Sequence, residues 1–154
     1  MTSSESASGF GSKKPNPYRR TQARRRALQA LYQWDLTGQS ASDIDAQFRV
    51  NQEMDRVDVE YFSDLLRGVV GNAAKLDAAI APHSDIALAD CDPIERNVLR
   101  LAAFELMYRL DIPVRVAVNE SVELTKLFGA EGGYKYVNGV VDKLAHVARK
   151  VEMG

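Results

Sequence analysis

The sequence predicts an all-α protein, a single compact domain of about six or seven helices. Apolar residues recur every three or four positions along most of the chain, which is the period of a helix that buries one face. No segment of useful length alternates apolar and polar residues as a half-buried strand does, so we expect no sheet. The chain has 154 residues, of which 45% are hydrophobic, and this is enough for one domain with its own core.

The folded part is expected to begin after a tail. Residues 1–17 are rich in Ser, Gly, Lys and Pro and cannot bury enough apolar surface to offset the entropy of ordering. We therefore expect a disordered tail over 1–17 and a folded domain over 18–154. The first helix is predicted from Tyr18 to Leu36, before Gly38, and its core side chains are Ala27, Leu28, Leu31 and Trp34.

Two helices are expected in the next stretch. A short one covers Asp43–Val50, with Ser42 as its N-cap. A long one covers Val57–Ala81 and is stopped by Pro82, because proline cannot continue a helix. The apolar residues of the long helix follow helical spacing and are Tyr61, Phe62, Leu65, Leu66, Val69, Leu76 and Ile80.

A sharp helix start follows at Asp92. Asp92 can cap the helix and Pro93 suits its first position, while Glu95 sits where a capping box closes. This helix is expected to run to Leu110 and to be broken by the segment Asp111–Pro113.

Two helices complete the chain. One covers Arg115–Phe128 and ends at Gly129, and the last begins after Gly132-Gly133. The loops between these helices are short, so consecutive helices should pack antiparallel or nearly so. The apolar stripe of the last helix consists of Val137, Val140, Val141, Leu144, Val147 and Val151.

The sequence offers no motif for catalysis, a metal ion or a cofactor. His83 and His146 are not in a metal-ligand spacing, and Cys91 stands between two aspartates, a setting that does not activate a thiol. No glycine-rich phosphate loop or dinucleotide fingerprint is present. We therefore expect a binding protein with no catalytic residue, no metal and no cofactor.

Charge is unevenly distributed along the chain. Residues 1–26 hold seven basic residues and one acid, a net charge of +6, whereas the whole chain has a net charge of −1. A basic arm on an acidic body is typical of nucleic-acid contact, although a solubility tail or an arm that binds an acidic protein stays open. A single cysteine suits a reducing compartment, and no apolar run approaches the roughly 20 residues of a membrane span. We expect a cytoplasmic protein with no membrane contact.

The first helix carries a candidate RNA-binding face. Arg24, Arg25, Gln29 and Tyr32 are expected on its exposed side, and the last three follow the spacing i, i+4, i+7. A guanidinium, an amide and a phenol in one strip can pair with phosphate, hydrogen-bond a base edge and stack on a base. A solvated face with a tucked tyrosine is the alternative.

A second candidate lies at the start of the last helix. Gly132 and Gly133 open this helix, so its free N–H groups and positive dipole end can face an anion. Lys135 adds a charge, and Tyr134 or Tyr136 offers a ring for stacking. One of these tyrosines is expected to pack inward.

Six blocks of the chain, in order over residues 19–148, form a recognisable set: Arg24–Tyr32, Asp58–Val69, Ile94–Leu106, Asp111–Pro113, Val116–Leu124 and Phe128–Asp142. Together these blocks resemble the NusB family of transcription antitermination and termination factors. The resemblance implies two packed helical bundles that bind the single-stranded boxA element of nascent RNA together with the small-subunit ribosomal protein NusE. Other Nus factors and RNA polymerase would be indirect partners.

The resemblance also implies roles for individual residues. Glu95 matches an acidic position that the family uses toward the ribosomal protein. Members of the family usually have a polar, often acidic, pair before the last helix, whereas this chain has Gly132-Gly133. We hypothesise that the loss of an acid at this place weakens the repulsion of phosphate and so raises the affinity for RNA. The residues that correspond to the family's RNA contacts are Arg20, Arg24, Gln29, Tyr32, Lys135 and Tyr136.

Two other functions stay open at this point. A protein-only interaction module or a homodimer would leave the arginine arm as a mere tail. A similar helical domain also resembles the N-terminal part of certain ribosomal-RNA cytosine methyltransferases, although the chain has no methyl-donor glycine motif.

Overall fold

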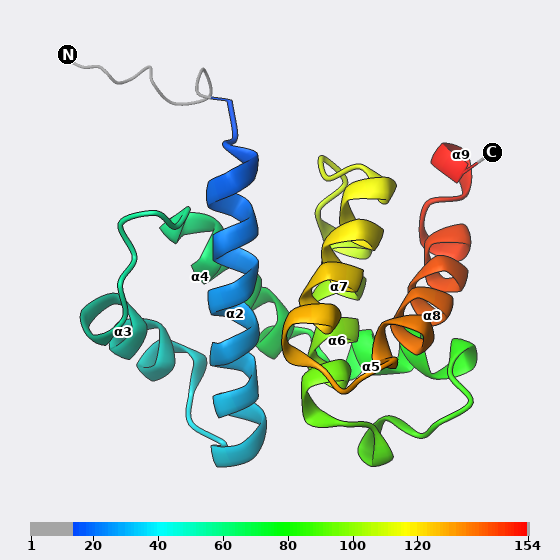
Figure 1. Ribbon diagram of the computed structural model, residues 1–154, viewed down its shortest axis with the longest axis horizontal. Helices are drawn as coiled ribbons and strands as arrows, with labels where there is room; N and C mark the ends of the chain where they lie inside the picture. Colours follow the sequence, from blue (N-terminus) through cyan, green and yellow to red (C-terminus); the bar gives the residue numbers. More distant parts are fainter. Residues whose placement is uncertain (1–13, 154) are drawn as a thin grey trace.

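The computed structural model describes residues 14–153, and every regular element within this range is helical, as predicted (Figure 1). Seven helices have eight residues or more, and a four-residue helix and two short 3-10 turns accompany them. In chain order the elements are α2 (Pro17–Thr37), α3 (Ala41–Asn51), α4 (Val59–Gly71), α5 (Ala73–Ile80), η1 (Ala81–His83), η2 (Leu88–Asp90), α6 (Pro93–Tyr108), α7 (Val114–Phe128), α8 (Gly133–Ala148) and α9 (Lys150–Met153).

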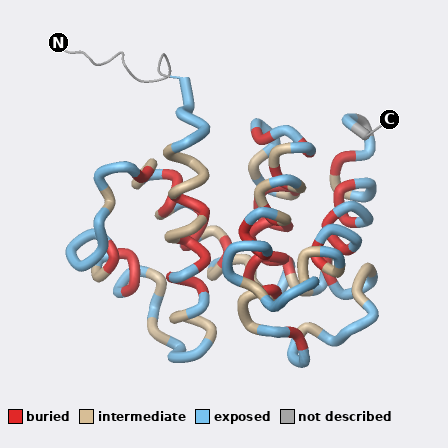
Figure 2. The backbone as a smooth tube through the Cα atoms, in the orientation of Figure 1, coloured by how far each residue is buried: buried red, intermediate tan, exposed pale blue. Residues whose placement is uncertain are grey.

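The helices form the two expected groups. Figure 1 shows α2, α3 and α4 on one side and α5, α6, α7 and α8 on the other. Both α2 and α4 also contact α6, so one hydrophobic core runs through both groups. Figure 2 shows the buried residues concentrated on the faces that the helices turn toward one another. Most of the helices therefore bury one stripe, as their apolar spacing predicts, whereas α6 lies at the centre and is buried on all sides from Asn97 to Leu106.

The start of α2 corrects the expected tail. Residues 1–13, most of that tail, lie outside the described residues. Pro17, however, is the first residue of α2, where its fixed φ suits the helix. Asn16 caps this helix, because its side chain accepts a hydrogen bond from the backbone N–H of Arg19 at 3.0 Å.

The next two boundaries also differ from the prediction. Ser40 rather than Ser42 caps α3, and its hydroxyl accepts from the backbone N–H of Asp43 at 3.1 Å. The long helix expected over Val57–Ala81 is two helices that meet at Asn72. The Asn72 side chain donates to the carbonyl of Gly68 at 2.8 Å, which satisfies a carbonyl at the end of α4.

The start of α6 follows the prediction in part. Asp92 accepts from the backbone N–H of Ile94 at 2.7 Å, and Pro93 is the first helical residue. The capping box is incomplete, because the carboxylate of Glu95 turns away from Asp92 toward the loop before α8. Within the described range, no helix combines the length and apolar character needed to cross a membrane.

Candidate nucleic-acid interface

One face of α2 carries a polar and aromatic strip. Gln29 is exposed, Tyr32 keeps 38% of its surface accessible and Arg25 is half-buried. Their spacing of four and three residues places them along one side of the helix. An amide that can pair with a base edge, close to a ring that can stack on a base, forms a surface suited to unpaired nucleotides.

Arg24 does not belong to this strip, and the expectation that it is exposed is wrong. Its side chain is 4% exposed, and its guanidinium donates to Glu105 at 2.8 Å and to Glu120 at 3.1 Å. The hydroxyl of Tyr61 donates to the same carboxylate of Glu105. Burial alone would lower the pKa of Arg24, but the charges of these neighbours outweigh it and raise the pKa. Arg24 therefore ties α2 to α6 and α7 and is not free to meet a phosphate.

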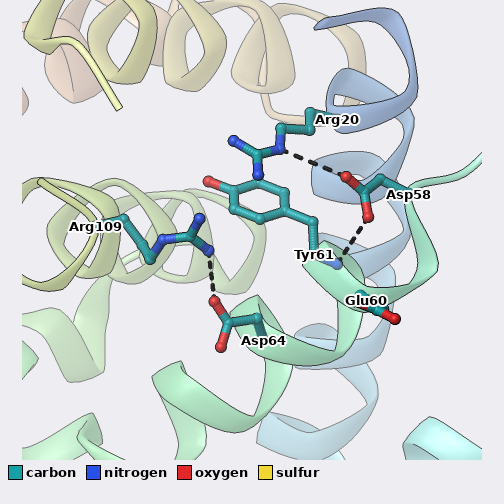
Figure 3. Close-up of a pocket in the computed structure, with 6 residues that line it drawn as sticks. All are labelled: Arg20, Asp58, Glu60, Tyr61, Asp64 and Arg109. Carbon is teal, nitrogen blue, oxygen red and sulfur yellow. Dashed lines mark hydrogen bonds and ion pairs between the residues drawn. The ribbon is translucent and has the colours of Figure 1, made fainter. Parts of the chain in front are cut away.

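Arg20 lies at the edge of a polar pocket of about 330 Å³ (Figure 3). Its guanidinium stands over the ring of Tyr61 at 4.3 Å, and Arg109 covers the same ring at 4.8 Å. The ion pairs of Arg20 with Asp58 and Asp111 are long, at 3.5 and 3.8 Å. Such loose, partly exposed pairs contribute only about 0–1 kcal/mol each, so the guanidinium can turn toward a phosphate.

Two other arginines of the basic segment hold the protein's own loop, a role that the sequence analysis missed. Arg19 donates to the carbonyls of Asp55 and Val57, both at 3.0 Å. Arg26 donates to the carbonyl of Glu53 at 3.2 Å. These bonds fasten the loop between α3 and α4 to α2. No sequence signal marks them, because the acceptors are backbone carbonyls.

The second candidate, at the start of α8, is placed only partly as expected. Lys135 is exposed. The hydroxyl of Tyr136 is engaged with Ser84 at 2.5 Å and with Cys91 at 3.3 Å, and burial together with the bond to Cys91 raises the pKa of Tyr136 to about 12. The ring of Tyr134 lies beneath the ammonium of Lys126 at 4.8 Å. Tyr136 is thus the tyrosine that packs inward, and its expected role as a stacking plane is not supported by this placement.

Glu95 also points inward, against the loop over residues 129–133. The residue is only 9% exposed. A Cβ added to Gly133 would lie 2.1 Å from its Oε2 atom, so the carboxylate packs directly on glycine backbone. Burial and the charge of Asp92 raise the pKa of Glu95, and a hydrogen bond from the backbone of Ala130 opposes this rise. The contact of Glu95 with the ribosomal protein stays a prediction.

Both candidate surfaces are attached to the first turn of α6. Asp35, three residues after Tyr32, accepts from the guanidinium of Arg96 at 2.9 Å. Glu95, the residue before Arg96, lies against Gly133 at the start of α8. Consecutive residues of α6 therefore hold the end of α2 and the beginning of α8, which places the two surfaces at the same end of α6.

The described residues contain no group of three or more His, Cys, Asp or Glu side chains arranged to hold a metal ion. Cys91 is a buried free thiol that contacts the carbonyl of Ala87 at 3.5 Å.

Known proteins are similar to this chain over most of its length. The model of the NusB family matches residues 21–146. Transcription antitermination protein NusB of Alcanivorax borkumensis is 52% identical over 136 residues, which cover 88% of this chain and 91% of that protein. The solved structure of NusB from T. maritima is 27% identical with a TM-score of 0.76, and the match covers 92% of this chain and 99% of that one. A crystal structure described as antitermination factors NusB and NusE in complex with dsRNA is 28% identical with a TM-score of 0.68, over 82% of this chain and 96% of that one.

Proposed function

Because the chain belongs to the NusB family, we propose that it is an RNA-binding transcription antitermination factor. It binds boxA-type single-stranded RNA in nascent transcripts together with the ribosomal protein NusE. With the other Nus factors, this complex acts on elongating RNA polymerase, as in ribosomal RNA synthesis. No bond is made or broken in this role, so the protein is not an enzyme.

The observation that carries this proposal is the exposed strip of Gln29 and Tyr32 at the same end of α6 as Lys135. In the proposed complex Tyr32 stacks on a base, Gln29 hydrogen-bonds a base edge and Lys135 pairs with a phosphate. Arg20 at the other end of α2 exchanges its loose ion pairs for a second phosphate. These four residues retain the roles that the family resemblance implies.

The remaining residues expected at the interface receive supporting roles. Arg24 fixes the orientation of α2 through Glu105, and Tyr136 fixes the start of α8 through Ser84. The acidic body of the protein complements a basic ribosomal protein. Glu95 is buried against the loop over residues 129–133, so its part in that contact is to shape this loop.

Double-stranded RNA is the second candidate ligand, because the solved relative that contains NusE is described with dsRNA. The two ligands differ in what Tyr32 can do. The bases of a single strand can splay out and stack on a ring, whereas paired bases in an A-form helix cannot. Replacing Tyr32 with Ala therefore distinguishes the two ligands.

The test is a titration of fluorescent boxA-type RNA, offered as a single strand or as a duplex, over a range of salt concentrations. We expect the single strand to bind more tightly. Its log Kd should depend on log salt with a slope of magnitude about 1.4, since Lys135 and Arg20 make two phosphate contacts and each contact on a single strand contributes about 0.7. Tyr32→Ala should weaken single-strand binding only. No RNA binding under any condition would instead favour a protein-only module or a homodimer.

A methyltransferase domain is the less favoured alternative. The chain covers 91% of the length of its Alcanivorax relative, which is named for antitermination. The similarity is therefore to an antitermination protein over nearly its whole length.

A further inference from the structure

A buried carboxylate without a cationic partner stands at the amino end of α8. Glu95 is 9% exposed, and no ion pair joins its carboxylate to a cation within the described residues. The groups that influence this carboxylate include Asp92, the hydroxyl of Tyr136 and the backbone of Ala130. Burying a carboxylate without a cationic partner is costly unless hydrogen bonds or a favourable dipole compensate for the lost hydration.

The amino end of α8 lacks a capping side chain. Gly132 is its N-cap residue, with a φ of 81°, and no side chain accepts a hydrogen bond from the first turn. The backbone N–H groups of Gly133 and Lys135 donate to the carbonyls of Ala130 and Gly132, so the positive end of the helix dipole is what makes this end attractive to an anion. The carboxylate of Glu95, which comes from α6, lies beside this end and supplies the missing negative charge.

Gly133 is what allows this approach. A Cβ at Gly133 would lie 2.1 Å from Oε2 and 2.7 Å from Cδ of Glu95, so any other residue at this position would displace the carboxylate. The second flank of the carboxylate faces Gly129, where an added Cβ would lie 3.6 Å from Oε2. The loop over residues 129–133 is therefore shaped around one carboxylate.

We propose that Glu95 is a positioning residue for RNA binding. Its carboxylate holds the 129–133 loop against α6 and occupies the anion position at the amino end of α8. The loop is thereby ordered before RNA arrives, and phosphate is directed to Lys135, two residues further along, instead of to the helix end. The negative charge also limits the affinity for RNA. The effect on affinity rests on the proposed function, whereas the ordering of the loop does not.

Two substitutions separate the two effects. Glu95→Gln keeps the size of the side chain and an acceptor for the Ala130 N–H but removes the charge. Glu95→Ala removes both. The matched control is Glu123→Gln, which neutralises an exposed carboxylate on α7 that lies 3.8 Å from Lys126.

Hydrogen exchange of the backbone amides over 129–133 is measured on the free protein, and single-stranded boxA-type RNA is titrated at fixed salt. We expect Glu95→Gln to retain amide protection and to bind RNA about threefold more tightly, the size expected when one nearby, partly screened repulsion is removed. Glu95→Ala should lose the protection, and Glu123→Gln should change neither quantity.

Gly133→Ala is the second route to the same result, because its methyl group displaces the carboxylate without altering Glu95. It should also lose amide protection over 129–133. The proposal is overturned if Glu95→Gln binds RNA no more tightly than wild type, or if both Glu95→Ala and Gly133→Ala keep wild-type protection. If wild type binds no RNA, the proposed function fails, and the exchange data alone then decide whether Glu95 orders the loop.

Discussion

The guanidinium of Arg24 meets the carboxylate of Glu105 at 2.8 Å, and both side chains are less than 5% exposed. This pair joins α2, from one helical group, to α6, from the other. The hydroxyl of Tyr61, on α4, donates a hydrogen bond to the same carboxylate, so Glu105 connects α2, α4 and α6. The orientation of the proposed RNA-binding helix is therefore fixed from inside the protein.

Replacing Arg24 with Ala should destabilise the fold strongly. Removing Arg24 leaves the buried Glu105 carboxylate without its cation and with only the Tyr61 hydroxyl as a donor, which costs about 3–5 kcal/mol. Urea unfolding followed by circular dichroism measures the change. The control is Arg25→Ala on the same helix, which should stay within about 0.5 kcal/mol of wild type. Equal stability of the two variants would contradict the assignment of Arg24 as a structural residue.

The burial of Arg24 could not be predicted from the sequence, although most of the helices could. The sequence predicted all seven long helices except for the break at Asn72, because apolar residues recur at helical spacing along most of them. Burial of an arginine depends on carboxylates that lie 81 and 96 positions away in sequence, and no local pattern reveals them. Charge therefore predicted a basic surface, whereas tertiary pairing decided which arginines remain on it.

The glycines before α8 illustrate the same limit. The sequence suggested a helix end open to an external anion. The structure places the carboxylate of Glu95 there, and Gly132 has a φ of 81° that gives this glycine a conformational reason of its own. The glycine pair and the carboxylate of Glu95 therefore both influence RNA affinity at the start of α8, and substitutions at Glu95 are needed to distinguish their effects.

Tyr32 should contribute to RNA affinity and little to stability. Base stacking on an aromatic ring is worth about 1–3 kcal/mol, so Tyr32→Ala should weaken single-strand binding by roughly 5- to 150-fold. Tyr32→Phe keeps the ring and should stay close to wild type. Fluorescence anisotropy with labelled RNA measures both variants. Tyr108→Ala, which removes another exposed tyrosine, should leave the affinity unchanged; a loss equal to that of Tyr32→Ala would contradict a specific role for Tyr32.

Two glycine-to-alanine substitutions should change the stability of the protein in opposite directions. A Cβ at Gly68 would lie 2.2 Å from the ring of Phe104, where α4 packs on α6, so Gly68→Ala should destabilise the protein by about 1–3 kcal/mol. Gly139 lies within α8 and has open space around it, so Gly139→Ala should stabilise by about 0.5–1 kcal/mol. Thermal unfolding of both variants measures the signs. A stabilising Gly68→Ala would disprove the close contact of α4 with α6.

Asp45 should make stability depend on pH in the acid range. Burial alone would raise the pKa of Asp45, but hydrogen bonds from Arg49, Ser63 and Arg67 outweigh it and lower the pKa below its ordinary value of 3.8. A lowered folded-state pKa contributes stability that is present above the unfolded-state value and is lost as pH falls through the folded-state value.

Asp45→Asn should therefore be less stable than wild type at pH 7, and the difference should shrink below about pH 4. Urea midpoints at pH 7 and pH 3 measure it. A difference that is the same at both pH values would show that the charge of Asp45 is not the source of the stabilisation.

The central claim is that the α2 strip and the start of α8 bind unpaired RNA together with NusE. The most direct measurement is the affinity for single-stranded boxA-type RNA with and without purified NusE, for wild type and for Tyr32→Ala. We predict that wild type binds the RNA alone, that NusE tightens this binding, and that Tyr32→Ala weakens it in both conditions. Absence of RNA binding in both conditions, with or without NusE, would contradict the claim.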